Sequence, residues 1–220
     1  MVNIEIEEGF RRACPGFSGV AISADIVNSE PDDALWCEID SRVAAYREAY
    51  TVDSVKDIDA IRATRDAYRA LGKDPSRYRP SAEALCRRVL RGMQLYRVST
   101  VVDLVNLVSM ETGYSIGGFD ADKIVGDRLV LGVGRDGEPY EGIGRGPLNI
   151  ASLPVYRDGA GGIGTPTSDN ERTKIDLATS HLLLIVNSYG ATSPDDAAEE
   201  LEALLLKYAS ASNIDKVKFR

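Results

Sequence analysis

Apolar residues in the first half of this chain recur every three or four positions, which is the spacing of amphipathic helices. The pattern predicts helices over residues 32–50, 54–72, 80–93 and 101–111. Gly72 is a typical stop for the second of them. The fourth is apolar nearly all round, so we expect it to be buried. Its β-branched beginning, Thr100-Val101-Val102, also fits the start of a strand, which is the alternative.

Short stretches with alternating or continuous apolar residues predict the strands. These are expected over residues 3–7, 19–27, 128–133, 153–157 and 181–187. Asp136-Gly137 and Asp158-Gly159 are typical of hairpin turns. Ser193-Pro194-Asp195-Asp196 predicts the start of a last helix, which reaches Tyr208. It combines an N-cap, a proline at the first position and acids at the positive helix end.

The order of these elements indicates the fold class. Helices fill the first half, antiparallel strands fill the second, and a helix closes the chain. This is an α+β order, without the βαβ alternation of a parallel sheet. No repeat and no linker divides the sequence. A length of 220 residues with 44% hydrophobic composition suits a single domain, residues 1–220, with a sizeable core.

Composition argues against several classes of protein. No apolar run approaches the ~20 residues of a membrane span, and the acidic N-terminus lacks the pattern of a signal peptide. Cys14, Cys37 and Cys86 are widely spaced without a CxxC pair, so they indicate neither disulfides nor a zinc site. The single histidine, His181, excludes three-histidine zinc chemistry and is expected to make structural hydrogen bonds. We expect a cytoplasmic protein without a metal or cofactor.

Charge is distributed unevenly along the chain. The net charge is −8, which argues against strong non-specific binding to nucleic acid. Residues 62–97 nevertheless hold ten basic and three acidic side chains, or +7, so the remainder carries −15. This segment is either a pair of helices with solvated arginine faces or an arginine patch for RNA phosphates.

Residues 132–137 match the GxGxxG pattern of dinucleotide-binding loops. Such a loop needs a helix N-terminus directly after its glycines, because that end binds the pyrophosphate. The sequence Glu138-Pro139-Tyr140-Glu141-Gly142 follows instead, and its acids would repel phosphate. A glycine-rich hairpin is therefore the better interpretation.

The stretch from Arg97 to Ile124 holds the most specific pattern of the chain. Its ordered positions are Arg97, Val101-Val102-Asp103, Asn106, Gly113, Phe119-Asp120 and Asp122-Lys123-Ile124. In these positions the chain resembles the tRNA-binding B3/B4 module of the phenylalanyl-tRNA synthetase β subunit. Where that family carries a histidine before Ala-Phe-Asp, this chain has Gly117-Gly118 before Phe119. The resemblance covers about residues 80–188, with the N-terminal elements and the C-terminal helix as additions.

The resemblance implies a layered α+β domain with an antiparallel β-sandwich and flanking helices. In the synthetase this module forms an editing pocket that hydrolyses wrongly attached amino acids from tRNA, and its histidine helps to recognise the wrong one. One wall of the equivalent pocket would bind substrate through Asn106, Ser115, Gly117, Gly118 and Phe119. Without the imidazole the pocket is expected to be wider.

The polar loop 164–173 is the other candidate wall, because it gathers hydroxyls, carboxylates, an amide and a guanidinium within ten residues. Candidates for the chemistry are Thr167, Ser168, Asp169 and Glu171, with Thr165 as a further substrate contact. A carboxylate with a hydroxyl partner can hold an α-amino group or position a water, and Asp169 and Glu171 compete for the family's acid. An exposed turn is the alternative, since these residue types favour turns.

Three functional hypotheses follow from the sequence. The leading one is a stand-alone hydrolase that removes an amino acid from mischarged tRNA, with Arg79, Arg87, Arg88 and Arg91 on the tRNA backbone. The competing one is a module that binds a free amino acid, a related small metabolite or RNA without catalysis. The third is an interaction scaffold that offers the acidic helices 32–50 and 194–208 to a protein partner.

Overall fold

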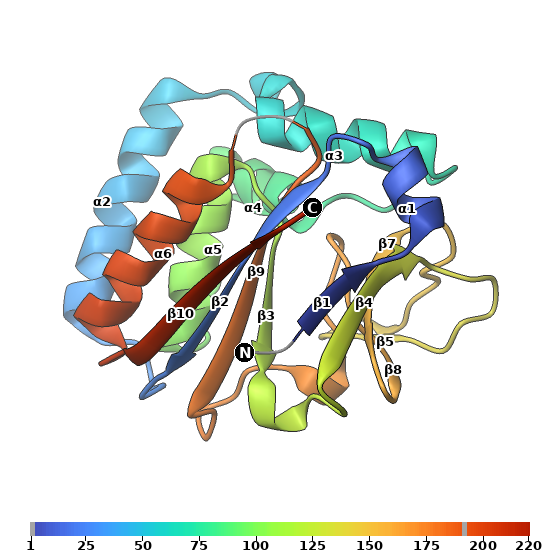
Figure 1. Cartoon of the computed structure of the whole chain (residues 1–220). Coiled ribbons are helices and arrows are strands. Elements are labelled where there is room, and N and C mark those ends of the chain that lie inside the picture. The colour runs from blue at the N-terminus through green and yellow to red at the C-terminus, as the bar shows by residue number, and fades with distance from the viewer. Residues whose placement is uncertain (1–2, 191–192) are drawn as a thin grey trace.

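The computed structural model of the chain describes residues 3–190 and 193–220, which form three layers (Figure 1). Helices α2, α5 and α6 cover one face of a four-stranded sheet, and a second four-stranded sheet lies on its other face. The helices are α1 (Glu8–Ala13), α2 (Asp33–Ala49), α3 (Asp59–Ala70), α4 (Ser81–Leu90), α5 (Thr100–Thr112) and α6 (Asp195–Tyr208). Short 3-10 turns are η1 (Ser54–Asp57), η2 (Ala121–Lys123) and η3 (Glu171–Thr173).

The strands belong to two four-stranded sheets and one short hairpin. They are β1 (Asn3–Ile6), β2 (Ser18–Asp25), β3 (Ile116–Asp120), β4 (Arg128–Val133), β5 (Glu141–Gly142), β6 (Gly146–Pro147), β7 (Pro154–Asp158), β8 (Gly161–Gly164), β9 (His181–Ser188) and β10 (Ser212–Phe219). The central sheet has the order β10-β2-β9-β3, antiparallel throughout. The outer sheet has the order β1-β4-β7-β8, in which only β1 and β4 are parallel. The predicted α+β class is confirmed.

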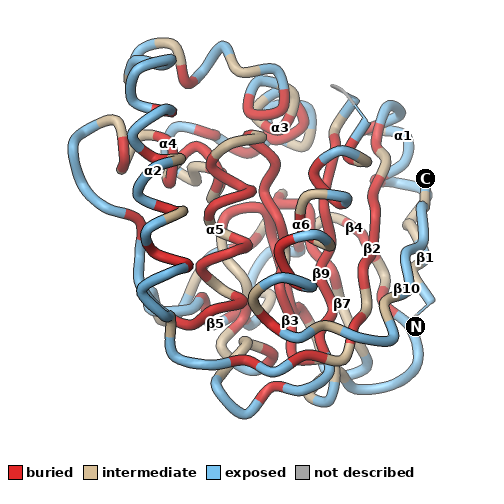
Figure 2. Tube along the Cα trace, turned by 90° about the vertical axis from the view of Figure 1, so that its left-hand side faces the viewer, coloured by how far each residue is buried: buried red, intermediate tan, exposed pale blue. Residues whose placement is uncertain are grey.

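The central sheet separates two hydrophobic cores (Figure 2). Ile22 of β2 and Leu184 of β9 face the helices, whereas Ala21 and Ile185 face the outer sheet. This alternation is the period of two that a strand imposes on its side chains. Because both faces of β9 are covered, its residues read as one apolar run rather than as an alternating pattern.

Several elements differ from the prediction. The stretch 100–112 is helical from its first residue, so the alternative of a strand start is wrong. The predicted helix over 54–72 is divided into η1 and α3, because Ile58 between them is extended. Asp136-Gly137 forms a turn but no β-hairpin, since β4 pairs with β1 and β7. The chain also ends in β10 rather than in the last helix, and α1, β3 and β8 were not predicted.

Asp103, in the most specific sequence pattern, is a buried structural carboxylate. It accepts hydrogen bonds from Nε1 of Trp36 at 3.0 Å and from the backbone N–H of Val98 at 2.8 Å. Burial raises its pKa to about 6, against the lowering effect of these bonds. Arg97 makes its ion pair with Asp33, at 3.3 Å. The pattern therefore anchors α5 to α2 and to the turn before α5.

The remaining sequence features have structural settings. His181 is the first residue of β9, and its Nδ1 lies 2.8 Å from a carboxylate oxygen of Asp122, as its expected structural role requires. The three cysteines carry free thiols, two buried and one exposed. None of the helices in the described part of the chain combines the length and the apolar character needed to cross a bilayer.

Candidate functional site

The candidate site lies where the edges of the two sheets meet, because β3 and β8 are the outermost strands of their sheets. Asp169 joins them. Its Oδ2 accepts a hydrogen bond from the backbone N–H of Gly118 on β3, at 3.0 Å. Its own backbone lies opposite Gly164 of β8 in an isolated β-bridge. The carboxyl group of Asp169 is therefore fixed by the free edge of the central sheet.

Glycines make room for this carboxyl group and for the ring of Phe119. A Cβ on Gly164 would lie 2.5 Å from Cζ of Phe119 and 2.9 Å from Oδ1 of Asp169. A Cβ on Gly117 would lie 2.9 Å from the same Phe119 ring. The ring of Phe119 is buried and occupies the side of β3 on which Gly117 replaces the family's histidine. Phe119 therefore fills the space beside Gly117 and Gly164.

The acid–base character of Asp169 follows from this position. Burial raises its pKa to about 7, although the hydrogen bond from Gly118 opposes the shift. The residue as a whole remains partly accessible. A carboxyl group with a pKa near neutrality is well suited to accept and return a proton at physiological pH. Such a perturbed group is also a frequent marker of a functional site.

The hydroxyl groups of the loop are engaged within the loop itself or with its immediate neighbours. Oγ1 of Thr165 accepts from the backbone N–H groups of Thr167 and Ser168, at 3.2 and 3.1 Å, and donates to the carbonyl of Ser168 at 2.9 Å. Thr167 is buried, and its Oγ1 lies 2.9 Å from the hydroxyl of Tyr68. The Ser168 hydroxyl donates to the carbonyl of Asp169 at 3.1 Å. These bonds fix the loop that presents Asp169.

Two tyrosines support the loop, and sequence reasoning did not assign them to the site. The Tyr140 hydroxyl donates to the carbonyl of Ser168 at 2.7 Å, and Tyr68 holds Thr167 from α3. Burial raises the pKa of both phenols, so both stay neutral. Tyr68 was identifiable as a buried face residue of α3. Its contact with Thr167, 99 residues away, had no signal in the sequence.

The β5–β6 hairpin forms the outer rim of the site. The backbone N–H of Ile143 donates to the carbonyl of Asp169 at 3.0 Å. Next to it, the Ser168 hydroxyl and the Cβ of Arg145 lie 3.2 and 3.5 Å from the position that a Cβ would take at Gly142. Arg145 is exposed, and no ion pair joins it to another described residue. Its guanidinium is therefore a free cation at the rim.

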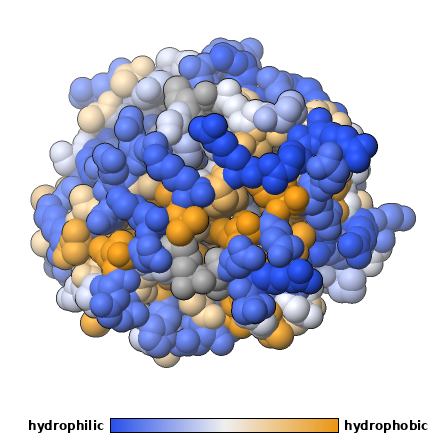
Figure 3. Space-filling view, viewed as in Figure 1, coloured by the Kyte–Doolittle hydropathy of each residue, from blue (hydrophilic) through white to orange (hydrophobic). Residues whose placement is uncertain are grey.

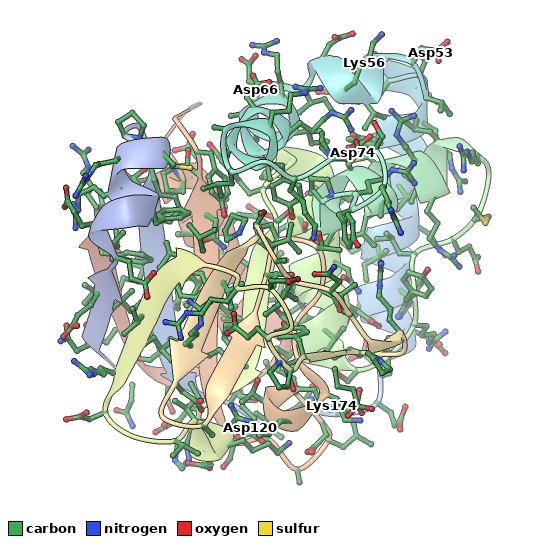
Figure 4. All side chains as sticks on the ribbon, turned by 90° about the vertical axis from the view of Figure 1, so that its right-hand side faces the viewer. Asp53, Lys56, Asp66, Asp74, Asp120 and Lys174 are labelled. Carbon is green, nitrogen blue, oxygen red and sulfur yellow. The ribbon has the colours of Figure 1, made fainter. Side chains whose placement is uncertain are left out.

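The other predicted site residues lie around this centre in different roles. Ser115 is buried, and its Oγ accepts the backbone N–H of Ala82 at the start of α4, at 3.5 Å. Asn106 is half-buried on α5, with no hydrogen bond from its side chain to another described residue. Glu171 is ion-paired with Lys174 in and beside η3. Figure 4 labels Lys174 at the same end of the molecule as Asp120, opposite Lys56 and Asp66.

The arginines proposed for RNA divide into two groups. Arg87 approaches the fully buried carboxylate of Glu83 at 2.8 Å and Arg79 approaches it at 3.7 Å, together with Arg65 at 2.8 Å. Arg88 covers the ring of Tyr96, and Arg91 is exposed beyond the end of α4. The first group is engaged in an internal ion cluster, whereas the second lies at the surface.

Three surface hollows lie away from Asp169. One of about 600 Å³ lies between α1, α3 and the end of β9, next to Cys14 and Asp66. One of about 310 Å³ lies beside His181, and one of about 310 Å³ lies along the charged face of α3. The face of the molecule seen in Figure 1 also exposes apolar surface between polar side chains (Figure 3). Among the described residues, no group of three or more histidines, cysteines and acids is arranged to hold a metal ion.

Comparison with known proteins agrees with this architecture. A family model described as the B3/4 domain matches residues 63–204. Fifteen chains of solved structures are similar to the protein. One is an N-terminal fragment of the phenylalanyl-tRNA synthetase β subunit from Pyrococcus horikoshii, with a TM-score of 0.54 and 11% identity. The match covers 100% of this chain and 54% of that one, so this chain spans about half the length of the fragment.

At 11% sequence identity, the similarity to this solved structure establishes the fold alone. No curated protein matches the sequence. The family match begins within α3 and ends within α6, so it includes Asp169, Phe119 and the three glycines of the site.

Proposed function

We propose, since the chain belongs to the B3/4 domain family, that it hydrolyses the ester bond between an amino acid and a mischarged tRNA. The observation that supports this most directly is Asp169. Burial raises the pKa of its carboxyl group to about 7, the Gly118 N–H fixes that group, and the residue as a whole is partly accessible. A fixed carboxylate that is ionised at neutral pH in part of the molecules can serve as a general base and then as a general acid.

In the proposed reaction a water molecule attacks the ester carbonyl while Asp169 takes its proton. The tetrahedral intermediate then breaks at the bond to the ribose oxygen, and Asp169 returns the proton to that oxygen. One water is consumed, and the products are the free amino acid and the free tRNA end. No nucleophilic side chain is needed, which fits the internal engagement of Thr165, Thr167 and Ser168.

The rim supplies a complementary contact for the nucleic acid part of the substrate. Arg145 is an exposed cation on the β5–β6 hairpin, whose Ile143 N–H donates to the carbonyl of Asp169. A guanidinium is a strong partner for a phosphate. We assign it to the terminal phosphates of the tRNA, so Arg145→Gln should raise KM more than it lowers kcat.

Deacylation of a panel of aminoacyl-tRNAs, correctly charged and mischarged, tests the proposal, with tyrosyl-tRNA for phenylalanine as the lead substrate. The rate on one mischarged species should exceed that in buffer, and Asp169→Asn should lower it about 100-fold or more. Glu171→Gln tests the rival acid of the same loop and should change the rate little. Asp136→Asn, in an exposed turn, controls for the loss of a carboxylate. Equal loss in Asp169→Asn and Glu171→Gln would contradict the assignment to Asp169.

A second candidate function is a binding module without catalysis. The specific observation in its favour is the Phe119 ring, which lies against Gly117 and Gly164 beside the carboxyl group. The Asp169 carboxyl group beside this ring would bind the ammonium group of a free amino acid. Calorimetric titration with free amino acids separates the two functions: binding that is lost in Asp169→Asn, without any deacylation, supports the module.

A further inference from the structure

The loop between α4 and α5 displays an unusual combination of side chains. Together with the adjoining parts of both helices, over residues 84–102, it contains four arginines and no acid, in a chain whose net charge is −8. The loop also exposes large apolar and aromatic surface: Met93, Tyr96 and Val98 are 42%, 52% and 51% exposed. An exposed aromatic ring beside exposed arginines typically marks a site of interaction.

Tyr96 forms the centre of this surface. The guanidinium of Arg88 lies 3.9 Å from the centroid of the Tyr96 ring. Nε of the same arginine donates to the carbonyl of Gln94 at 2.6 Å. This hydrogen bond helps to hold the guanidinium in place over the ring. Because more than half of Tyr96 remains exposed, the ring keeps a surface on which another flat group can stack.

The loop that carries Tyr96 is anchored before any ligand arrives. Leu95 is buried in the core beneath it. Arg47 of α2 donates from Nε to the carbonyl of Val89 and from a terminal nitrogen to that of Met93, both at 2.9 Å. A preformed platform loses little conformational freedom on binding, which favours affinity.

Two more arginines stand near the platform. Arg91 is exposed, and its side chain forms no ion pair or hydrogen bond with another described residue. Arg97 is paired with the exposed Asp33 at 3.3 Å, donates to the carbonyl of Pro31 at 3.0 Å and lies 5.3 Å from the centroid of the Trp36 ring. Neither is engaged by a buried acid, unlike Arg87, which is held by Glu83. Arg91 is therefore the cation that is available to a phosphate.

We propose that the platform formed by Arg88 and Tyr96 binds unpaired RNA, with one base stacked on the Tyr96–Arg88 pair and an adjacent phosphate on Arg91. Stacking on an aromatic ring together with backbone phosphate contacts is the general mode by which proteins bind single strands. Bases within a duplex are covered by their neighbours and cannot reach such a ring. An acidic peptide would satisfy the arginines but would leave the ring without a partner.

This platform is separate from the Asp169 site. The N-terminus of α4 faces that site, because the backbone N–H of Ser81 donates to the carbonyl of Pro166 at 2.7 Å. Arg88 and Arg91 stand at the opposite end of the helix, which at ten residues is about 15 Å long. RNA binding here therefore does not depend on the proposed hydrolysis, and an equilibrium binding measurement without any ester tests it alone.

The experiment is fluorescence anisotropy of a labelled, unstructured 12-nucleotide RNA, at 50 and at 200 mM salt. A duplex RNA of the same length and a polyglutamate peptide serve as competitors. Tyr96→Ala should weaken binding about tenfold or more, whereas Tyr96→Phe should retain it, because stacking needs the ring and not the hydroxyl. Arg91→Gln should weaken binding and reduce the slope of log Kd against log salt by about one.

Matched controls exclude loss of fold and unspecific charge effects. Leu206→Ala removes an equally exposed apolar residue on α6, and Arg12→Gln removes an exposed arginine on α1, so both should bind as the wild type does. The proposal is overturned if the wild-type chain binds no RNA, if Tyr96→Ala binds as well as Tyr96→Phe, or if duplex or polyglutamate competes better than the single strand.

Discussion

The backbone N–H of Gly118 donates to Oδ2 of Asp169 across 3.0 Å, and this bond joins the edge of the central sheet to the loop after the outer sheet. Gly118 is a position at which a strand must pass close to another chain segment. A Cβ added at Gly118 would lie 3.0 Å from the side chain of Ile175 and 3.4 Å from that of Leu184. The Gly117-Gly118 pair thus serves two close approaches, one on each face of β3. This packing places Asp169, and burial there raises its pKa, although the Gly118 bond lowers it.

The stability of the chain should depend on pH through Asp169. Its pKa is raised from 3.8 to about 7 on folding, so the protonated form is favoured in the folded state. Below about pH 4 both states are protonated and this contribution is fully present. As pH rises toward 7 only the unfolded state releases the proton, so the contribution is lost. Relative to Asp169→Asn, the wild type should therefore lose stability between pH 4.5 and 7.5. Urea unfolding of both proteins at the two pH values measures this, and a constant difference would refute it.

Adding one methyl group at Gly164 should disturb the site and destabilise the fold. The new Cβ would lie 2.5 Å from the Phe119 ring and 2.9 Å from the Asp169 carboxyl group. Overpacking of this kind costs about 1–3 kcal/mol. Gly9→Ala, in α1 with nothing within 4 Å of its Cβ, should be neutral or stabilising. Chemical denaturation tests both variants, and a shared loss would point to a general effect of alanine rather than to the Phe119 contact. Phe119→Leu should partly rescue Gly164→Ala.

Removal of the Asp103 carboxylate should destabilise the chain by about 3 kcal/mol. Asp103→Ala leaves the indole N–H of Trp36 and the backbone N–H of Val98 without acceptors in a buried place. Asp33→Ala, which removes an exposed partner of Arg97, should cost under about 0.5 kcal/mol. Urea unfolding of the wild type and of both variants measures these differences in the free energy of unfolding. Similar values for both variants would show that the buried hydrogen bonds of Asp103 contribute little.

Neutralising Glu83 should have a larger effect than neutralising an exposed acid of the same region. Glu83→Gln leaves three arginines without their buried carboxylate, and breaking one side of a buried ion cluster costs about 3–5 kcal/mol. Asp66→Asn removes only an exposed pair with Arg69. Thermal unfolding should show a clearly lower Tm for the first variant alone. If the two variants have the same Tm, the buried ion cluster contributes no more to stability than an exposed ion pair does.

Parts of this fold are predictable from local sequence and other parts depend on distant contacts. Helices α2 and α4 carry an apolar stripe with recognisable ends, so their periodicity predicts them. Strand β3 contains Gly117-Gly118, which lack β propensity, and it is a strand because β9 pairs with it. Strand β10 is largely exposed at the sheet edge and carries lysines, so it has no apolar signature.

The candidate site likewise combines features that local sequence predicts with features that depend on distant contacts. The loop 164–173 with Asp169 was predicted from its composition and from family resemblance, and the structure places it against β3. The supporting tyrosines were not predicted, because their contacts with the loop cross 28 residues in the case of Tyr140 and 99 in the case of Tyr68. The raised pKa of Asp169 was equally hidden, since it arises from burial between two sheets. Sequence alone could not rank Asp169 above Glu171.

The central claim, that the Asp169 carboxyl group drives ester hydrolysis, is tested most directly by the pH dependence of deacylation. The rate on the preferred mischarged tRNA is measured between pH 5.5 and 8.5 for the wild type and for Asp169→Asn, after subtraction of hydrolysis in buffer. The wild-type rate should rise through about pH 7 and level off as Asp169 ionises, and the variant should show a low, flat profile. Profiles that coincide for the two proteins would contradict the claim.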